Sequence, residues 1–233
     1  MTVSLRIKFI MHPEANQFVA KVKAKFPKYF TGKKVLEVGS LNINGTVRDF
    51  FTDCDYAGID VAAGNGVDRV LHLTELLQEC TETTKGRYAS MPFRSLCDVM
   101  ISTEALEHDE LWDKSLEAMS ALLKPGGILI ITCAGPNRPE HGTTKADPDS
   151  SPFTTDYYRN ISVEDFQSVL PMSLWTDAEL TYGRDGEDLY FYGIKSSQTV
   201  VIAEGEVVET EVGVGGIRFD AQAVASPDRA AES

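Results

Sequence analysis

The sequence lacks the features of membrane-bound and disulfide-linked proteins. Among its 233 residues, no apolar run approaches the roughly 20 residues needed to span a bilayer. The first residues, Met1 to Ile10, carry two scattered cations but no long apolar core and no small-residue cleavage site, so we expect no signal peptide. The cysteines are widely spaced and form no CxxC pair, which predicts buried thiols in a reducing compartment. They are Cys54, Cys80, Cys97 and Cys133. We therefore expect a cytoplasmic protein without membrane contact.

Positive charge is also scarce. The chain carries 22 Lys and Arg residues against 35 Asp and Glu residues, a formal net charge of −13. Such an acidic body offers no general attraction to phosphate backbones, which disfavours nucleic acid as a partner. Much of the acidic excess lies in residues 197–233, which predicts a disordered acidic tail. The composition says nothing about oligomeric state.

What the sequence does contain is an alternation of strand-like and helix-like stretches. Apolar runs predict strands at 34–38, 56–60, 67–71, 97–102 and 127–133, and an edge hairpin of 175–182 with 189–195. Apolar residues at helical spacing and helix-start signals predict helices at 13–26, 47–51, 74–80, 110–123 and 162–170. This alternation predicts an α/β fold, with a Rossmann-like, seven-stranded, mostly parallel sheet, helices on both faces and a C-terminal antiparallel edge hairpin. We expect a helical lead-in (1–32), one domain (33–196) and the tail (197–233).

Two residues at the ends of the first two strands indicate a nucleoside-type ligand. Gly39 directly follows the first buried strand, where a glycine permits a tight turn and close approach of a ligand. Asp60 ends the second strand 21 residues later, the spacing at which a carboxylate can accept both ribose hydroxyls. Together they predict a ligand site at the carboxyl edge of the sheet.

The turn after the first strand lacks the further glycines of a dinucleotide-binding loop. It reads Gly-Ser-Leu-Asn-Ile-Asn-Gly over residues 39–45, with bulky residues where the second and third glycines belong. Close approach of a pyrophosphate is therefore disfavoured, and a ligand without phosphates fits better.

Five motifs follow one another between residues 33 and 133. They are Val-Leu-Glu-Val-Gly-Ser (35–40), Tyr-Ala-Gly-Ile-Asp-Val (56–61), Met-Pro-Phe with Cys-Asp-Val-Met-Ile-Ser (91–93, 97–102), Thr-Glu-Ala-Leu-Glu-His (103–108) and Leu-Lys-Pro-Gly-Gly (123–127). This series resembles the class I S-adenosylmethionine-dependent methyltransferases, in particular the small-molecule type with a Glu-x-Leu-Glu-His pattern after the fourth strand. The resemblance implies S-adenosyl-L-methionine as the cofactor.

The resemblance also implies roles around the methionine end of the cofactor. Glu37 and Gly39 would line it, and Ser40 with the loop to Gly45 would wrap it. The sequence departs from the family at Leu41, which replaces the second glycine of the Gly-x-Gly loop. This departure concerns the conformation of the cofactor loop.

For the nucleoside and the sulfonium, the resemblance points to residues after the next strands. Asp60 would bind the ribose and Val61 would pack against the adenine, whose edge would meet His72. Thr103 and Glu104, just past the fourth strand, would face the sulfonium and the acceptor.

Three residues are candidate bases for the transfer: Glu104, His108 and His141. A histidine in the position of His108 often serves only to fix the loop and helix start. His141 lies in a long polar segment, 134–160, where we expect acceptor specificity to reside. The acids and histidines show no metal-ligand spacing, so we predict no metal.

The leading hypothesis is an enzyme that methylates a small molecule. A faint likeness of the region over residues 138–160 to methyltransferases of surface-polysaccharide pathways suggests a sugar or glycan-related hydroxyl. A second hypothesis gives the enzyme a nucleic acid or protein acceptor. A third is a non-catalytic, cofactor-binding interaction module. Fold alone does not decide between them.

Overall fold

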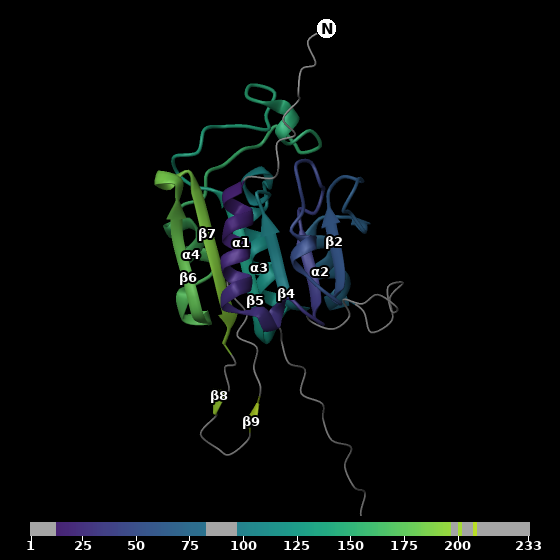
Figure 1. The fold of residues 1–233 in the computed structure, drawn as a ribbon, viewed down its shortest axis with the longest axis vertical. Coiled ribbons are helices and arrows are strands. Elements are labelled where there is room, and N and C mark those ends of the chain that lie inside the picture. The colour runs from purple at the N-terminus through teal and green to yellow at the C-terminus, as the bar shows by residue number, and fades with distance from the viewer. Residues whose placement is uncertain (1–12, 83–96, 197–199, 202–206, 209–233) are drawn as a thin grey trace, which may run out of the picture.

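A computed structural model describes residues 13–82 and 97–196, together with 200–201 and 207–208. Its centre is a seven-stranded sheet in the order β3-β2-β1-β4-β5-β7-β6 (Figure 1). The strands are β1 (Lys34–Val38), β2 (Asp55–Asp60), β3 (Arg69–Val70), β4 (Cys97–Thr103), β5 (Leu123–Ala134), β6 (Trp175–Gly183) and β7 (Asp188–Lys195). The first five are parallel, and β7 runs antiparallel to both β5 and β6. The predicted fold class, with its antiparallel edge hairpin, is confirmed.

Helices cover both faces of the sheet, as predicted. In front lies α1 (Pro13–Lys25), whose Phe18, Val19 and Val22 form one core cluster with β1, β4 and β5 residues of the same face (Figure 1). The other helices are α2 (Leu73–Glu82), α3 (Trp112–Leu122) and α4 (Val163–Val169). They contribute apolar residues to the cluster on the opposite face. Because both faces of the parallel part are covered, β5 carries a continuous buried run over residues 127–134.

Several element boundaries differ from the sequence prediction. The third strand is only two residues long, and the helix expected at 47–51 is a short 3-10 turn, Arg48–Phe50. The most apolar strand begins at Leu123 rather than at residue 127. It pairs through a register shift between Cys97 and Val99, which accommodates the Pro-Gly-Gly sequence within the strand. The helix before it, α3, ends at Leu122 as the Pro-Gly-Gly signal predicts, but the strand starts at once instead of after the glycines.

The capping signal before α4 is confirmed. The Ser162 side chain accepts the Asp165 backbone N–H, and the Asp165 carboxylate accepts the backbone N–H of Ser162. This reciprocal pair satisfies two of the orphan donors at the helix start. Further 3-10 turns occur at Pro27–Tyr29, Leu106–His108, Pro148–Ser150, Met172–Leu174 and Arg184–Gly186.

The prediction of buried thiols holds only in part, and the predicted tail is described only in part. The four cysteines are free; Cys97 and Cys133 are buried, whereas Cys80 is exposed and Cys54 is half-buried. The expectation of buried thiols therefore holds for two of the four. Of the predicted tail, β8 (Val200–Val201) pairs with β9 (Val207–Val208), and the rest lies outside the described residues. Within the described chain, no helix combines the length and apolar character needed to cross a membrane.

Candidate functional site

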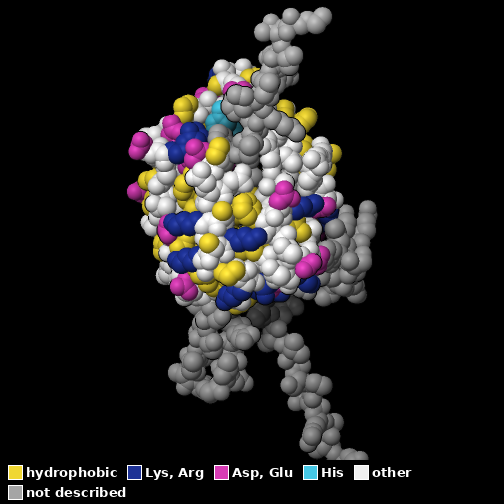
Figure 2. Space-filling model, viewed as in Figure 1, with side chains coloured by type: hydrophobic (Ala, Val, Ile, Leu, Met, Phe, Trp, Pro, Cys, Tyr) yellow, Lys and Arg dark blue, Asp and Glu magenta, His cyan; other side chains and the backbone are white. Residues whose placement is uncertain are grey.

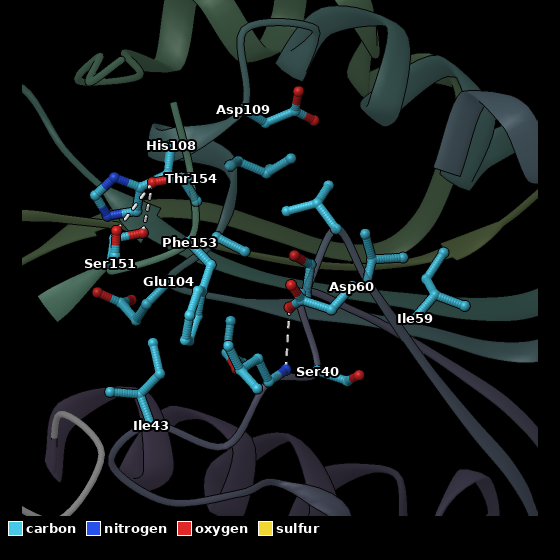
Figure 3. Close-up of a pocket in the computed structure, with 18 of the residues that line it drawn as sticks. Ser40, Ile43, Ile59, Asp60, Glu104, His108, Asp109, Ser151, Phe153 and Thr154 are labelled. Atoms are coloured by element: carbon cyan, nitrogen blue, oxygen red, sulfur yellow. Dashed lines mark hydrogen bonds between the residues drawn. The ribbon is translucent and has the colours of Figure 1, made fainter. Parts of the chain in front are cut away.

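A cavity of about 450 Å³ lies at the carboxyl ends of β1, β2 and β4 (Figure 3). It sits where the strand order reverses, since β2 and β3 follow on one side of β1 while β4 and β5 lie on the other. Open α/β sheets bind their ligands at this switch point. The volume falls within the roughly 300–1,000 Å³ of small-molecule sites.

All eleven residues predicted for the site line this cavity. They are Glu37, Gly39, Ser40, Gly45, Asp60, Val61, His72, Thr103, Glu104, His108 and His141. The cavity wall therefore carries both the residues proposed for the cofactor and those proposed for the acceptor. The role of each remains a prediction.

The turn after β1 requires a glycine for two reasons. Gly39 has φ +76°, and a Cβ there would lie 2.3 Å from the Cβ of Ala105 in the turn after β4. The amides of Gly39 and Ser40 both donate to the Ile59 carbonyl, which closes the turn against β2. The buried Ser40 hydroxyl packs against Gly58 of β2, where a Cβ would lie 2.5 Å from its oxygen.

The Asp60 carboxylate holds the same loop from the end of β2. Its Oδ2 accepts the Leu41 amide at 3.0 Å, and its Oδ1 accepts the Ala62 amide at 3.1 Å. Each oxygen retains a second lone pair that a ligand hydroxyl can use. Because the carboxylate fixes the residue that replaces the family's second glycine, the loop has a defined conformation without that glycine.

Exposed apolar side chains concentrate at the cavity. Of the six large apolar residues exposed in the described chain, four line it: Ile43, Val61, Leu111 and Phe153. Phe153 projects into the space between Asp60 and Glu104 (Figure 3). Apolar surface exposed at one site is typical of a ligand-binding surface.

His72 is placed at the cavity but is held by protein groups. Its Nδ1 lies 2.8 Å from the Thr74 hydroxyl, and its Nε2 lies 3.1 Å from the Asp109 carboxylate. The Asp109 carboxylate also raises the pKa of His72. Because both ring nitrogens are engaged, His72 has little capacity left to hydrogen-bond an adenine edge. Only the face of its ring is available for contact with a ligand.

Glu37 is a buried carboxyl group beneath the glycine turn. Tyr56 donates a hydrogen bond to its Oε2 at 2.9 Å. Burial raises its pKa to about 7, partly offset by the Tyr56 bond. The group is therefore close to half-ionised at neutral pH, and a cationic ligand group would ionise it fully.

Glu104 has strained backbone and a buried cationic partner. Its φ is +52°, a left-handed conformation that is uncommon for a non-glycine residue. Its Oε2 lies 2.6 Å from Nη2 of Arg138, and the same nitrogen lies 3.0 Å from Oδ1 of Asp188. Arg138, which the sequence analysis did not single out, thus fixes Glu104 from the start of the loop after β5.

The two candidate histidines meet at the other end of the cavity. The rings of His108 and His141 lie 5.1 Å apart at 87°, and Tyr158 contacts both. Gly142 permits this contact, because a Cβ there would lie 2.6 Å from Cε1 of His108. Burial, together with His141, lowers the pKa of His108 to about 4, so that its ring is neutral at physiological pH.

Glu107 is a group that the sequence analysis missed as a site residue. It is fully buried beside His108, and its carboxylate comes within 4.8 Å of the donor atoms of both histidines. The fold thereby assembles a group of potential ligands that shows no ligand spacing in the sequence. The Glu-x-Leu-Glu-His pattern was its only sequence signal.

The family model described as "Methyltransferase domain" matches residues 38–131. Among curated proteins, none matches this chain. Similar solved structures include a complex of DhpI with S-adenosylhomocysteine, 14% identical over 80% of this chain and 86% of that chain, with a TM-score of 0.51. Another is phosphoethanolamine N-methyltransferase 2 of Haemonchus contortus, bound to phosphomonomethylethanolamine and S-adenosylhomocysteine, at 16% identity, 82% coverage of this chain and a TM-score of 0.50.

At these identities the structural similarities show the fold. The chain spans about half the length of some of the structures it matches, with 55% of the Haemonchus enzyme and 54% of the CurJ carbon methyltransferase covered. The matched residues run from the end of β1 into β5 and include the glycine turn, Asp60 and Glu104. The chain thus matches a methyltransferase domain over residues 38–131, and it shares its fold, with a cavity at the switch point of the sheet, with these structures.

Proposed function

We propose that this protein transfers the methyl group of S-adenosylmethionine to a small-molecule acceptor, with a sugar or glycan-related hydroxyl as the favoured class. One observation carries the proposal: a single cavity joins the cofactor-side residues Asp60 and Val61 to Glu104, His108 and His141. A cavity of about 450 Å³ that takes both molecules leaves room for a small acceptor or one protruding group.

The residues at the cofactor end fit the cofactor. The Asp60 carboxylate offers acceptor lone pairs for ribose hydroxyls, and Val61, 50% exposed, offers an apolar surface for the adenine. Glu37 lines the same cavity and can face the cationic amino group of the methionine end. The absence of a side chain at Gly39 leaves the backbone open to close approach.

The cofactor supplies an activated methyl group bound to a sulfonium, a good leaving group. The chain's contribution is therefore to orient the acceptor in line and to exclude water. The segment after β5 serves both ends, since His141 and Phe153 from it line the cavity. Glu104 and the two histidines are the groups close enough to accept a hydroxyl proton or to hold the hydroxyl. The Phe153 ring offers an apolar face to the acceptor.

The charge distribution supports a small acceptor over a nucleic acid. Lysines gather on the face that α1 covers (Figure 2), but those of α1 have protein partners. Lys21 pairs with Glu179, Lys23 donates to the Phe50 carbonyl and Lys25 donates to the Tyr192 hydroxyl. Only the charge of Lys21 is neutralised by an acid, but the formal net charge of −13 gives a phosphate backbone no general attraction.

The proposal is tested first by calorimetric titration of S-adenosylhomocysteine and NADH into the purified protein. We expect micromolar binding of S-adenosylhomocysteine and none of NADH. Asp60→Ala should weaken the binding at least tenfold. Asp113→Asn, a half-exposed carboxylate of α3 outside the cavity, is the matched control and should bind as the unmodified protein does.

The second stage screens acceptors by transfer of labelled methyl from S-adenosylmethionine. Sugars and other small hydroxyl compounds are compared with RNA, DNA and protein. Turnover confined to macromolecules would contradict the small-molecule assignment. Tight cofactor binding without turnover on any class would favour a non-catalytic binding module instead. Failure of folded protein to bind S-adenosylhomocysteine would overturn the proposed function altogether.

A further inference from the structure

Three potential metal ligands converge at the acceptor end of the cavity. Glu107 and His108 lie on the 3-10 turn after β4, and His141 lies on the segment after β5. One donor atom from each falls within 4.8 Å of the others. His108 and His141 also line the cavity, so that the cluster borders the space proposed for the acceptor.

The Glu107 carboxyl group has an unusual environment for an acid. It is completely buried, and although the backbone amides of Glu107 and Ala134 approach it, neither of its oxygens makes a hydrogen bond of good geometry within the described protein. The nearby Arg138 directs its Nη2 to Glu104 and Asp188 instead. An ionised carboxylate buried without a partner costs several kcal/mol, so this position calls for a bound cation or a proton.

The two histidines are arranged as metal-binding histidines commonly are. His141 donates Nδ1–H to the Pro139 carbonyl at 3.0 Å, which makes Nε2 the nitrogen with the lone pair. His108 hydrogen-bonds to the backbone of Tyr157, while its Nδ1 is buried and has no partner within the described protein. In metal sites, a backbone carbonyl typically fixes the tautomer of the ligating ring in this way.

We propose that Glu107, His108 and His141 bind one divalent transition-metal ion, of the kind that zinc exemplifies. Two imidazoles and one carboxylate form a donor set that suits zinc or non-haem iron and leaves coordination positions open. In a tetrahedral site with bonds of about 2.0 Å, donor atoms lie about 3.3 Å apart. Small side-chain rotations from the 4.8 Å arrangement therefore complete the site.

The open positions would face the cavity, because the two histidines form part of its wall. An ion there would orient an acceptor oxygen toward the cofactor end. This role rests on the proposed function, whereas the metal site itself does not. The two can be tested separately.

The test is a titration of ZnCl₂ into the full-length protein after treatment with EDTA and removal of the chelator. We expect one Zn²⁺ per chain with micromolar or tighter affinity. Glu107→Gln, His108→Ala and His141→Ala should each weaken binding at least tenfold. His72→Ala is the matched control, a histidine held by Thr74 and Asp109 outside the cluster, and should leave Zn²⁺ binding unchanged.

Cobalt provides a second readout that a merely structural role would not change. Co²⁺ bound by two imidazoles and a carboxylate gives visible absorption, which should shift or disappear in the His141→Ala protein. Because His141 is only half-buried, this variant should fold even where Glu107→Gln does not. Binding weaker than millimolar, or binding that the histidine variants leave intact, would overturn the proposal.

Asp60→Ala separates this inference from the proposed function. The variant should lose S-adenosylhomocysteine and retain Zn²⁺. Zinc binding with no cofactor binding in the unmodified protein would sustain the metal site and reject the methyltransferase. Cofactor binding without zinc binding would do the reverse.

Discussion

Glu37 links the pH to the stability of the protein through a single buried carboxyl group. Its pKa is raised from 4.5 to about 7, so the folded state keeps a proton that the unfolded state loses. The contribution is fully present below about pH 4.5 and is lost as the pH rises toward 7. We expect Glu37→Gln to gain about 3 kcal/mol relative to the unmodified protein between pH 4.5 and pH 8.

Urea denaturation at these two pH values measures this difference. Other titrating groups occur in both proteins and cancel in the comparison. Glu14→Gln, at a half-buried position where the carboxylate pairs with Arg184, is the control and should show no comparable pH-dependent gain. A constant difference between Glu37→Gln and the unmodified protein at both pH values would contradict the prediction.

Arg138 carries a buried charge that two carboxylates neutralise. Its side chain is only 6% exposed, and those of Glu104 and Asp188 are 13% and 2% exposed. Replacing it with methionine keeps much of the volume but leaves two buried acids without their cation. We expect Arg138→Met to lower the free energy of unfolding by about 3–5 kcal/mol.

Chemical denaturation of Arg138→Met beside Lys114→Met measures this cost. Lys114 pairs with Glu117 on the surface of α3 and is 52% exposed, so its loss should change stability by less than about 1 kcal/mol. Equal effects of the two substitutions would mean that the buried triad contributes no more than a surface ion pair.

Some helices are stabilised by capping residues in their own sequence, and α4 shows this most clearly. The Ser162 hydroxyl accepts the Asp165 amide at 3.0 Å at the start of a helix of seven residues. Ser162→Ala removes one side of the capping box, and we expect a loss of about 1 kcal/mol in the free energy of unfolding.

Ser168→Ala in the same helix is the matched control. Its exposed hydroxyl donates to the Asp165 carbonyl, which is already part of the helix, and alanine has the higher helix propensity. The control should therefore cost little or nothing. If thermal or urea denaturation shows equal losses for both, the capping box does not stabilise α4 as described.

At the scale of the whole molecule, the sequence predicts what local patterns encode. Apolar runs predicted the parallel strands, and a glycine with a carboxylate 21 residues later predicted the edge at which the cavity lies, because Gly39 directly follows β1 and Asp60 ends β2. The parallel order brings those ends together regardless of the intervening residues.

Contacts between distant segments were not predictable in this way. Arg138 meets Asp188 across 50 residues, and Glu107 meets His141 across a strand and a helix. One sequence gives no information on which buried charge pairs with which, since burial and partner depend on the packed fold. The start of β5 at Leu123 was missed for the same reason. Leu123 is part of the strand because it pairs with Cys97 of β4, and the local Pro-Gly-Gly sequence gives no sign of that pairing.

Cofactor binding and the domain boundary can be tested together on the whole molecule. Both core clusters lie between Ala15 and Ile194, so a chain ending at residue 196 should retain the fold. A ligand that binds only the folded state at 100 times its Kd stabilises that state by about 2.7 kcal/mol. We expect S-adenosylhomocysteine to raise the Tm of the full and the shortened chain equally, by about 5–11 °C. Thermal scans of both chains with and without the ligand measure this. Asp60→Ala should abolish the shift at the same ligand concentration. A shift confined to the full chain would place part of the cofactor site in residues 197–233, against the predicted boundary.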